Sequence, residues 1–251
     1  GMRLPIVMAV ANRALSSPLS VWGDHSDVMA VRDTSWIQIF AENGQQALDQ
    51  TICAFRIGED PNVLFPVMVH LDGFHLSHVV EGLEMVEKST VDKFLPKLSY
   101  PYALNPDAPV TMGAFAMPNF FTEAKMAQDV AFLASKPVIL QAWKEYAELT
   151  GREYRPVEHY RTEDASALLL TMGSFSETAM VAVDELRDKG EKVGLIRLRL
   201  WRPFRFQELQ EAIQDAELLV VLDRCLSFGG PPGPVCSEVK AAMYSKDKGP
   251  H

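Results

Sequence analysis

The sequence predicts an α/β protein of two domains, each built around a parallel β-sheet. Its 251 residues are enough for one to two domains with full hydrophobic cores. Hydrophobic residues make up 47% of the chain and charged residues 23%, which is typical of globular proteins and excludes disorder for the bulk of the chain. Short apolar runs alternate with helical patterns, and this alternation is typical of parallel α/β sheets.

The charge and the apolar runs exclude two classes of partner. The chain has 33 acidic and 24 basic residues, a net charge of −9, and no cluster of Lys and Arg, so we expect no nucleic-acid partner. The longest apolar runs are about eight residues, far shorter than a membrane span, so we expect no membrane partner. The first residues show no secretory signal, and the three cysteines form no C-x-x-C pair, which together predict a cytoplasmic protein without its own metal centre.

The first domain is expected over residues 1–160. The run over residues 4–11 is rich in Val, Ile and Ala and predicts a buried strand, followed by an ordered loop. Apolar spacing then predicts a helical segment over 36–57, with a break near Asn43 and Gly44, and a second buried strand over 63–71 completes a βαβ unit. Beyond it, the sequence predicts an extended, proline-rich excursion over 85–120 and one helix over 123–149.

The second domain is expected over residues 161–251. A polar, turn-like stretch over 154–161 marks the boundary, which we place near 155–163. After it, strands and helices alternate again, which predicts a second parallel sheet. The expected strands cover 167–172, 192–200 and 218–223, the expected helices 177–189, 206–216 and 236–244, and a frayed tail covers 245–251.

Parallel sheets bind ligands where the carboxyl ends of their strands meet loops. Four such places follow from the expected strands: Asn12 with Arg13, residues 72–74, residues 173–175, and residues 223–224. The sequence therefore predicts a site built from these loops.

Arg13 is the most informative of these residues. It is a single cation directly after an apolar run in an acid-rich domain, and its planar guanidinium matches a carboxylate with two parallel hydrogen bonds. It is a candidate for binding an acidic substrate. The alternative is an ion pair with a nearby acid such as Asp24 or Asp27.

Two polar loops are candidates for shaping that site. Asp24, His25 and Asp27 place two carboxylates around one imidazole, an arrangement that fixes a histidine tautomer, contributes to a metal site, or only orders the loop. After the second strand, polar and turn-forming residues gather again, with a zinc site as a disfavoured alternative because no cysteine accompanies the histidines. The residues concerned there are Asp72, Gly73, Phe74 and His78.

Five motifs give the chain a resemblance to a known family, the alpha subunits of the pyruvate:ferredoxin oxidoreductases. They are MRLPIVM (2–8), VANRALS (10–16), WGDHSD (22–27), VMVHLDGFHLSH (67–78) and GEKVGLIRLRLWRPF (190–204). The resemblance implies a thiamine diphosphate pyrimidine-binding-like domain over 1–160, lacking its N-terminal part, and a transketolase C-terminal-like domain over 161–251.

The resemblance also implies a reaction. In this family a 2-oxoacid and coenzyme A give an acyl-coenzyme A and CO2, with electrons passing to ferredoxin or flavodoxin; we expect pyruvate as substrate and acetyl-coenzyme A as product. Thiamine diphosphate with magnesium is held mostly by a partner domain, and iron–sulfur clusters lie in partner subunits. The implied partners are a thiamine-binding beta subunit, a gamma subunit and a ferredoxin-like delta subunit.

Two site residues are carried over from the family by their motif positions. Arg13 binds the substrate carboxylate, and Leu19 lies against the cofactor. The family's alpha chain has an upstream strand and helix with a glutamate and a threonine of the site, so we expect this chain to be a fragment or a split subunit that is silent alone. The alternatives are a branched-chain 2-oxoacid enzyme, an E1 beta-like subunit of a dehydrogenase complex, and a non-catalytic scaffolding module.

Overall fold

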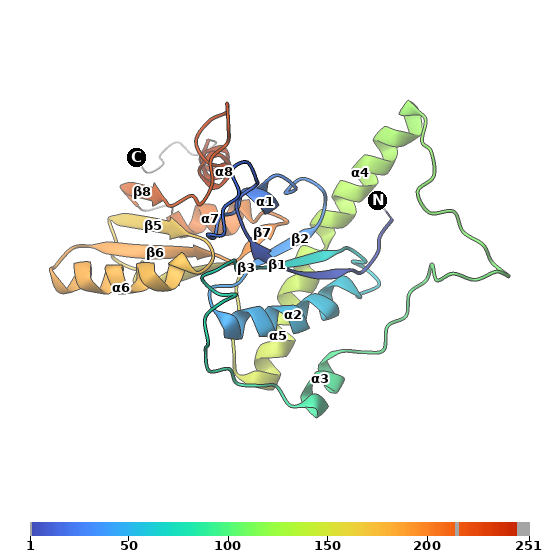
Figure 1. The fold of residues 1–251 in the computed structure, drawn as a ribbon, viewed down its shortest axis with the longest axis horizontal. Helices are drawn as coiled ribbons and strands as arrows, with labels where there is room; N and C mark the ends of the chain where they lie inside the picture. The colour runs from blue at the N-terminus through green and yellow to red at the C-terminus, as the bar shows by residue number, and fades with distance from the viewer. Residues whose placement is uncertain (1, 214–215, 245–251) are drawn as a thin grey trace.

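The computed structural model describes residues 2–213 and 216–244, which form two four-stranded sheets side by side (Figure 1). The first sheet has the order β1 (Val7–Asn12), β3 (Val67–Asp72), β2 (Ile37–Phe40) and β7 (Leu200–Arg202). The second has the order β4 (Val157–Tyr160), β6 (Val193–Leu198), β5 (Ala167–Thr171) and β8 (Leu218–Val221). Each sheet has three parallel strands and one antiparallel edge strand, so the expected parallel α/β class is confirmed.

Helices cover the sheets as amphipathic layers. Helix α2 (Gly44–Gly58) lies against β3 and β1 of the first sheet, and α5 (Lys136–Thr150) packs on α2 (Figure 1). Ile57, Ile139 and Trp143 of these helices share one buried cluster with Val67 and Val69 of β3. In the second sheet, α6 (Phe175–Asp188) covers one face, while α7 (Phe206–Ile213) and α8 (Pro234–Met243) cover the other. Buried side chains therefore line both faces of its central strands, as expected for a parallel sheet.

The prediction of one helical segment over residues 36–57 is wrong in its first part. Residues Ile37–Phe40 form strand β2 and are all buried, and α2 begins only after Asn43, whose side chain accepts a hydrogen bond from the Gln46 N–H at 2.9 Å. A short buried apolar run fits a helix and a strand equally well, so periodicity alone misassigned it.

The predicted single helix over 123–149 is two helices, α4 (Pro118–Ala134) and α5. They meet at the buried Ser135, whose hydroxyl donates to the Phe132 carbonyl at 2.6 Å. Pro137 occupies the first turn of α5, where its missing N–H costs nothing but where it cannot continue a preceding helix.

Other segments also differ from expectation. The turn-like stretch before the second domain contains β4, and the ordered loop that follows the first strand contains the short helix α1 (Ser26–Met29). The proline-rich excursion contains α3 (Lys88–Phe94) and then continues as a long extended segment (Figure 1). The expected frayed tail over 245–251 lies outside the described residues. Among the residues described, no helix is both long and apolar enough to span a membrane.

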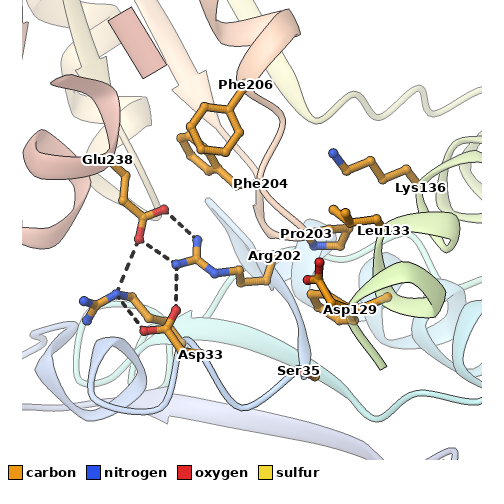
Figure 2. Close-up of a pocket in the computed structure, with 12 residues that line it drawn as sticks. Asp33, Ser35, Asp129, Leu133, Lys136, Arg202, Pro203, Phe204, Phe206 and Glu238 are labelled. Atoms are coloured by element: carbon orange, nitrogen blue, oxygen red, sulfur yellow. Dashed lines mark hydrogen bonds and ion pairs between the residues drawn. The ribbon is translucent and has the colours of Figure 1, made fainter. Parts of the chain in front are cut away.

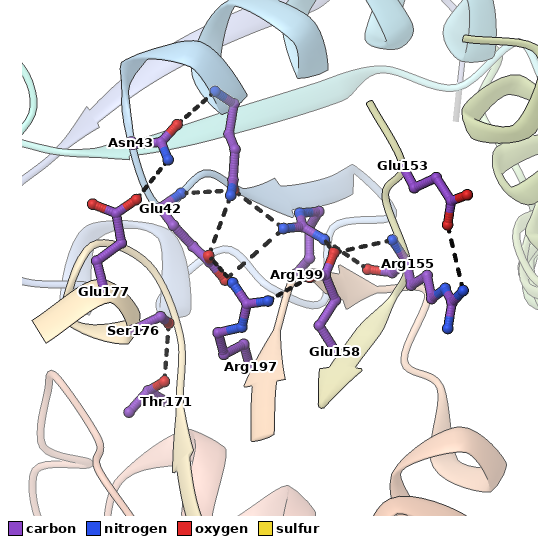
Figure 3. A network of polar contacts seen from close by, with 11 residues as sticks. Glu42, Asn43, Glu153, Arg155, Glu158, Thr171, Ser176, Glu177, Arg197 and Arg199 are labelled. Atoms are coloured by element: carbon purple, nitrogen blue, oxygen red, sulfur yellow. Dashed lines mark hydrogen bonds and ion pairs between the residues drawn. The ribbon is translucent and has the colours of Figure 1, made fainter. Parts of the chain in front are cut away.

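One strand from each side of the expected domain boundary, between residues 160 and 161, belongs to the sheet of the other side. The boundary itself stays a prediction. Strand β4 precedes that boundary but pairs with β6, and β7 follows it but pairs with β2. A buried polar network fixes this crossing (Figure 3). In it, Arg197 donates to Glu42 at 2.6 Å and to Glu158 at 2.7 Å, and Arg199 pairs with Glu158.

Candidate functional site

The carboxyl ends of β1 and β3 lie next to each other and begin the site. Asn12 and Asp72 are register partners at the last position of the two parallel strands, and both side chains are buried. The Asn12 amide contacts Asp27 Oδ1 and His70 Nδ1, each at 3.4 Å. The strand-end rule thus brings together the first two predicted loops.

The position of Arg13 depends on a backbone hydrogen bond and on the room that Gly73 leaves for its side chain. Its N–H donates to Asp27 Oδ2 at 2.9 Å, and its side chain lies against Gly73, where an added Cβ would come within 2.9 Å of Arg13 Cγ and collide with the Asn12 carbonyl oxygen. The guanidinium forms no hydrogen bond or ion pair with any residue in 2–213 or 216–244. Asp27 therefore orients the main chain of Arg13, and the guanidinium stays available to bind a ligand.

Asp27 and Asp24 order the loop that leads away from Arg13. Asp27 also accepts the Val28 N–H at 2.7 Å, and Asp24 accepts the Ser26 N–H at 2.6 Å. Burial raises the pKa of the Asp27 carboxyl, against the hydrogen bonds from Arg13 and Val28, which favour its ionised form. Both acids act on the backbone, so neither neutralises Arg13.

Asp72 is the centre of a second, buried cluster, which we call the Asp72 cluster: His25, Asp72, Ser174 and Arg224. His25 Nε2 donates to Asp72 Oδ1 at 2.7 Å, and Arg224 forms an ion pair with Asp72. Ser174 donates to Asp72 Oδ2 from its N–H at 2.7 Å and from its hydroxyl at 2.5 Å. The cluster thus joins loops from both sheets.

Electrostatics keep this carboxylate ionised. Burial raises the pKa of Asp72, but the hydrogen bond and charge of His25, the charge of Arg224 and the Ser174 hydroxyl outweigh it and hold that pKa well below its usual range. Asp72 is therefore a permanent buried anion balanced by the Arg224 cation. The nearby His70 is fully buried, and burial together with the charge of His25 lowers its pKa to about 3, so its imidazole is neutral.

The remaining predicted site residues lie at the surface. Phe74 stacks against His78, with ring centroids 5.5 Å apart, and packs edge-on against Trp22 at 4.4 Å. Leu19 is 82% exposed. The structure thus gathers Asn12, Arg13, His25, Asp27, Asp72 and Gly73 around one strand edge and leaves Leu19, Asp24, Phe74 and His78 outside the two hydrogen-bonded groups at Asp27 and Asp72.

The sequence did not single out Ser174 and Arg224 as site residues. The strand-end rule indicated both positions, because Ser174 follows β5 and Arg224 follows β8. Nothing in the sequence shows, however, that the loops of the second sheet meet those of the first. Across the described ranges, no group of three His, Cys, Asp or Glu side chains is arranged to hold a metal ion.

A pocket of about 430 Å³ lies elsewhere, between α4, the β7–α7 turn and α8 (Figure 2). Ser35, two residues before the start of β2, lines it, so the pocket is at the amino end of that strand. Arg202 fills one side and pairs with Glu238 and Asp33. It contains none of the predicted site residues, and ligands of parallel sheets bind at the opposite, carboxyl end.

Comparison with solved structures supports the fold. The chain superposes along its whole length on 46% of a 2-oxoglutarate:ferredoxin oxidoreductase chain from Magnetococcus marinus, with a TM-score of 0.62 and 14% sequence identity. At this identity the likeness concerns the fold.

Sequence comparison gives much nearer relatives. The pyruvate synthase subunit PorA of Methanothermobacter thermautotrophicus is 43% identical over 98% of this chain and 64% of its own length. PorA of Thermotoga maritima is 45% identical over 96% of this chain and 62% of its own length. The ketoisovalerate oxidoreductase subunit VorA of Pyrococcus horikoshii is 39% identical over 98% and 62%. The chain thus spans less than two thirds of the length of these relatives.

Two family models cover most of the chain. Residues 1–143 match the thiamine diphosphate-binding domain of the pyruvate flavodoxin/ferredoxin oxidoreductases, and residues 165–250 match core domain II of pyruvate:ferredoxin oxidoreductase. Together with the relatives, these matches confirm the resemblance seen in the sequence motifs. The chain belongs to the pyruvate flavodoxin/ferredoxin oxidoreductase family.

Proposed function

We propose that this chain is part of the alpha subunit of a cytoplasmic 2-oxoacid:ferredoxin oxidoreductase that converts pyruvate and coenzyme A to acetyl-coenzyme A and CO2. Two electrons leave through iron–sulfur clusters of partner subunits to ferredoxin or flavodoxin. The observation that carries the proposal is the Arg13 guanidinium, which stands at the carboxyl end of β1 without a partner among the described residues. Its role in this proposal is to bind the substrate carboxylate.

The surroundings of Arg13 suit that role. A guanidinium binds a carboxylate through two parallel hydrogen bonds, which fixes the direction of the adjoining keto carbon. The Asp27 contact holds the backbone, and Gly73 leaves room for the side chain, so the base of the side chain is fixed before substrate arrives. Such preorganisation lowers the entropic cost of reaching a reactive geometry.

The chain offers a surface for the organic part of thiamine diphosphate. Leu19, Trp22 and Phe74 expose apolar side chains on the two loops that flank Arg13, with Leu19 and Trp22 82% and 58% exposed. An aromatic ring packs well on such side chains. No group of three His, Cys, Asp or Glu side chains among the described residues is arranged to hold a metal ion, and we assign the magnesium–diphosphate group mostly to a partner domain of the beta subunit. Thiamine diphosphate supplies the electron sink for decarboxylation when bound.

The substrate has one specific alternative. A ketoisovalerate oxidoreductase subunit is 39% identical to this chain, close to the values for the pyruvate synthase subunits, so a branched-chain 2-oxoacid is the second candidate. Arg13 would hold either substrate by the same carboxylate. The family matches favour the ferredoxin-linked enzymes over a lipoate-linked E1 beta subunit, and the free guanidinium favours a catalytic part over a scaffold.

The test is Arg13→Ala in the full-length subunit, assembled with its partners under anaerobic conditions. We expect KM for pyruvate to rise on the order of 100-fold, because a charge-assisted bidentate contact is lost, while KM for coenzyme A stays unchanged. Arg155→Ala, which removes an exposed arginine, is the matched control. Unchanged pyruvate kinetics in Arg13→Ala would remove the role of Arg13 in binding the substrate carboxylate. If the wild type prefers ketoisovalerate to pyruvate, and Arg13→Ala raises KM for ketoisovalerate more than KM for pyruvate, the substrate is a branched-chain 2-oxoacid.

A further inference from the structure

Arg224 reaches from the second sheet into the site of the first. It follows β8, and its side chain is only 4% exposed. Its guanidinium pairs with Asp72 through Nη1 and donates to the Gly23 carbonyl through Nη2 at 3.1 Å. Its own carbonyl accepts the His25 N–H at 3.2 Å. One residue thus contacts both polar loops of the first sheet.

The contacts leave Arg224 little freedom. Its guanidinium lies over the Phe175 ring, 3.8 Å from the centroid, which adds a cation–π contact. At Gly23, an added Cβ would lie 2.9 Å from Arg224 Nη2 and 2.8 Å from the Gly73 carbonyl oxygen. The two loops and Arg224 are therefore packed so closely that there is no room for a side chain at position 23.

Both loops that Arg224 holds also set the position of Arg13. The Gly73 N–H, directly after Asp72, donates to the Asn12 carbonyl at 3.0 Å, and the Arg13 side chain lies on Gly73. The other loop carries Asp27, which holds the Arg13 N–H. A shift of either loop would move the guanidinium of Arg13.

We propose that Arg224 is a positioning residue for the 2-oxoacid: it fixes Arg13 from the second sheet by clamping the Asp72 and Gly23 loops together. This inference rests on the proposed function of Arg13. It makes substrate affinity a property of both halves of the chain, although only the first half would touch the carboxylate.

The experiment uses the full-length subunit in the assembled enzyme and compares Arg224→Lys and Arg224→Gln. Lysine keeps the charge beside the buried Asp72 and so protects folding, but it lacks the fork that serves Asp72 and Gly23 together. We expect KM for pyruvate to rise roughly fivefold with lysine and on the order of tenfold or more with glutamine, with KM for coenzyme A unchanged. Arg202→Gln, which breaks a partly buried ion pair away from the site, is the control and should leave both KM values unchanged.

A double-mutant cycle with Arg13→Ala separates positioning from general damage. If Arg224 acts through Arg13, then Arg224→Lys will not raise KM for pyruvate any further in the Arg13→Ala background. A purely structural role would lower the yield of active enzyme and leave KM for pyruvate unchanged, and an additive rise in the double variant would mean that Arg224 acts independently; either result overturns the inference. If Arg13→Ala itself has no effect, the proposed function fails first.

Discussion

Two clusters of charged residues lie between the two sheets, and they differ in the parts of the chain that they connect. The network of Glu42, Glu158, Arg197 and Arg199 pairs two acids with two arginines on strands and strand ends, mostly with one another (Figure 3). The Asp72 cluster instead ties loops together, and these loops carry the contacts that orient Arg13. The comparison teaches that charged groups between the same two sheets can have different roles: loss of the network should affect stability, and loss of the cluster should affect substrate binding.

The largest expected effect tests the network. Arg197→Met removes the 2.6 Å donor of Glu42, whose side chain is only 3% exposed, and so leaves a buried carboxylate poorly paired. We expect a loss of about 3 kcal/mol in the free energy of unfolding, measured by urea denaturation. Arg155→Met breaks the exposed pair with Glu153 nearby and should change it by less than about 1 kcal/mol. A stable Arg197→Met protein with a raised KM for pyruvate would reverse the roles given to the two groups.

The second prediction concerns pH and the buried imidazole beside the site. His70 has a pKa lowered to about 3 by burial and by the charge of His25, so between that value and its ordinary value only the unfolded chain takes up the proton. The contribution of His70 to stability should therefore decrease as pH falls from about 6.5 toward 3, by at most about 1.4 kcal/mol per pH unit. Chemical denaturation at several pH values measures this slope. His70→Leu should flatten it, and His159→Gln, which changes an exposed histidine, should leave it intact.

A third, smaller effect tests the space beside Arg13. In Gly73→Ala the new methyl group would collide with the Asn12 carbonyl oxygen and press on Arg13 Cγ. We expect KM for pyruvate in the assembled full-length enzyme to rise about fivefold, since displacement of a binding group weakens its contact. Gly82→Ala is the matched control, because an added Cβ there has no atom within 4 Å. Equal KM values in the two variants would show that Arg13 binds pyruvate equally well when the backbone at residue 73 is displaced.

The smallest effect is expected at Leu19. Because this side chain is 82% exposed, Leu19→Ala should change the free energy of unfolding by less than about 0.5 kcal/mol. In the assembled enzyme, contact with the cofactor would bury part of the side chain, so the Kd for thiamine diphosphate should rise about threefold. Titration of cofactor-depleted enzyme measures it, with Val181→Ala on the exposed face of α6 as control. An unchanged Kd would remove Leu19 from the cofactor surface.

The strand ends explain how far the sequence could predict this molecule. Apolar runs that stop just before Asn12 and Asp72 predict β1 and β3, and the register of the two parallel strands then brings these residues together. Asp72 closes β3 and is followed by Gly73, the residue that leaves room for Arg13. The part of the site that belongs to the first sheet could therefore be predicted from local patterns.

The contribution of the second sheet could not be predicted in the same way. Ser174 and Arg224 reach the site through contacts with Asp72, and these contacts depend on how two separate sheets pack. The short strand β2 was misassigned for a related reason, since its burial comes from long-range pairing with β3 and β7. Long-range packing is thus what the sequence pattern does not reveal.

The most direct test of the central claim asks whether Arg13 recognises the negative charge of the substrate. Steady-state kinetics of the assembled full-length enzyme would compare pyruvate with its uncharged methyl ester, in the wild type and in Arg13→Ala. We predict that the wild type strongly prefers pyruvate in kcat/KM and that Arg13→Ala loses most of this preference, because the bidentate contact to the carboxylate is gone. A variant that keeps the full preference for pyruvate would contradict the account.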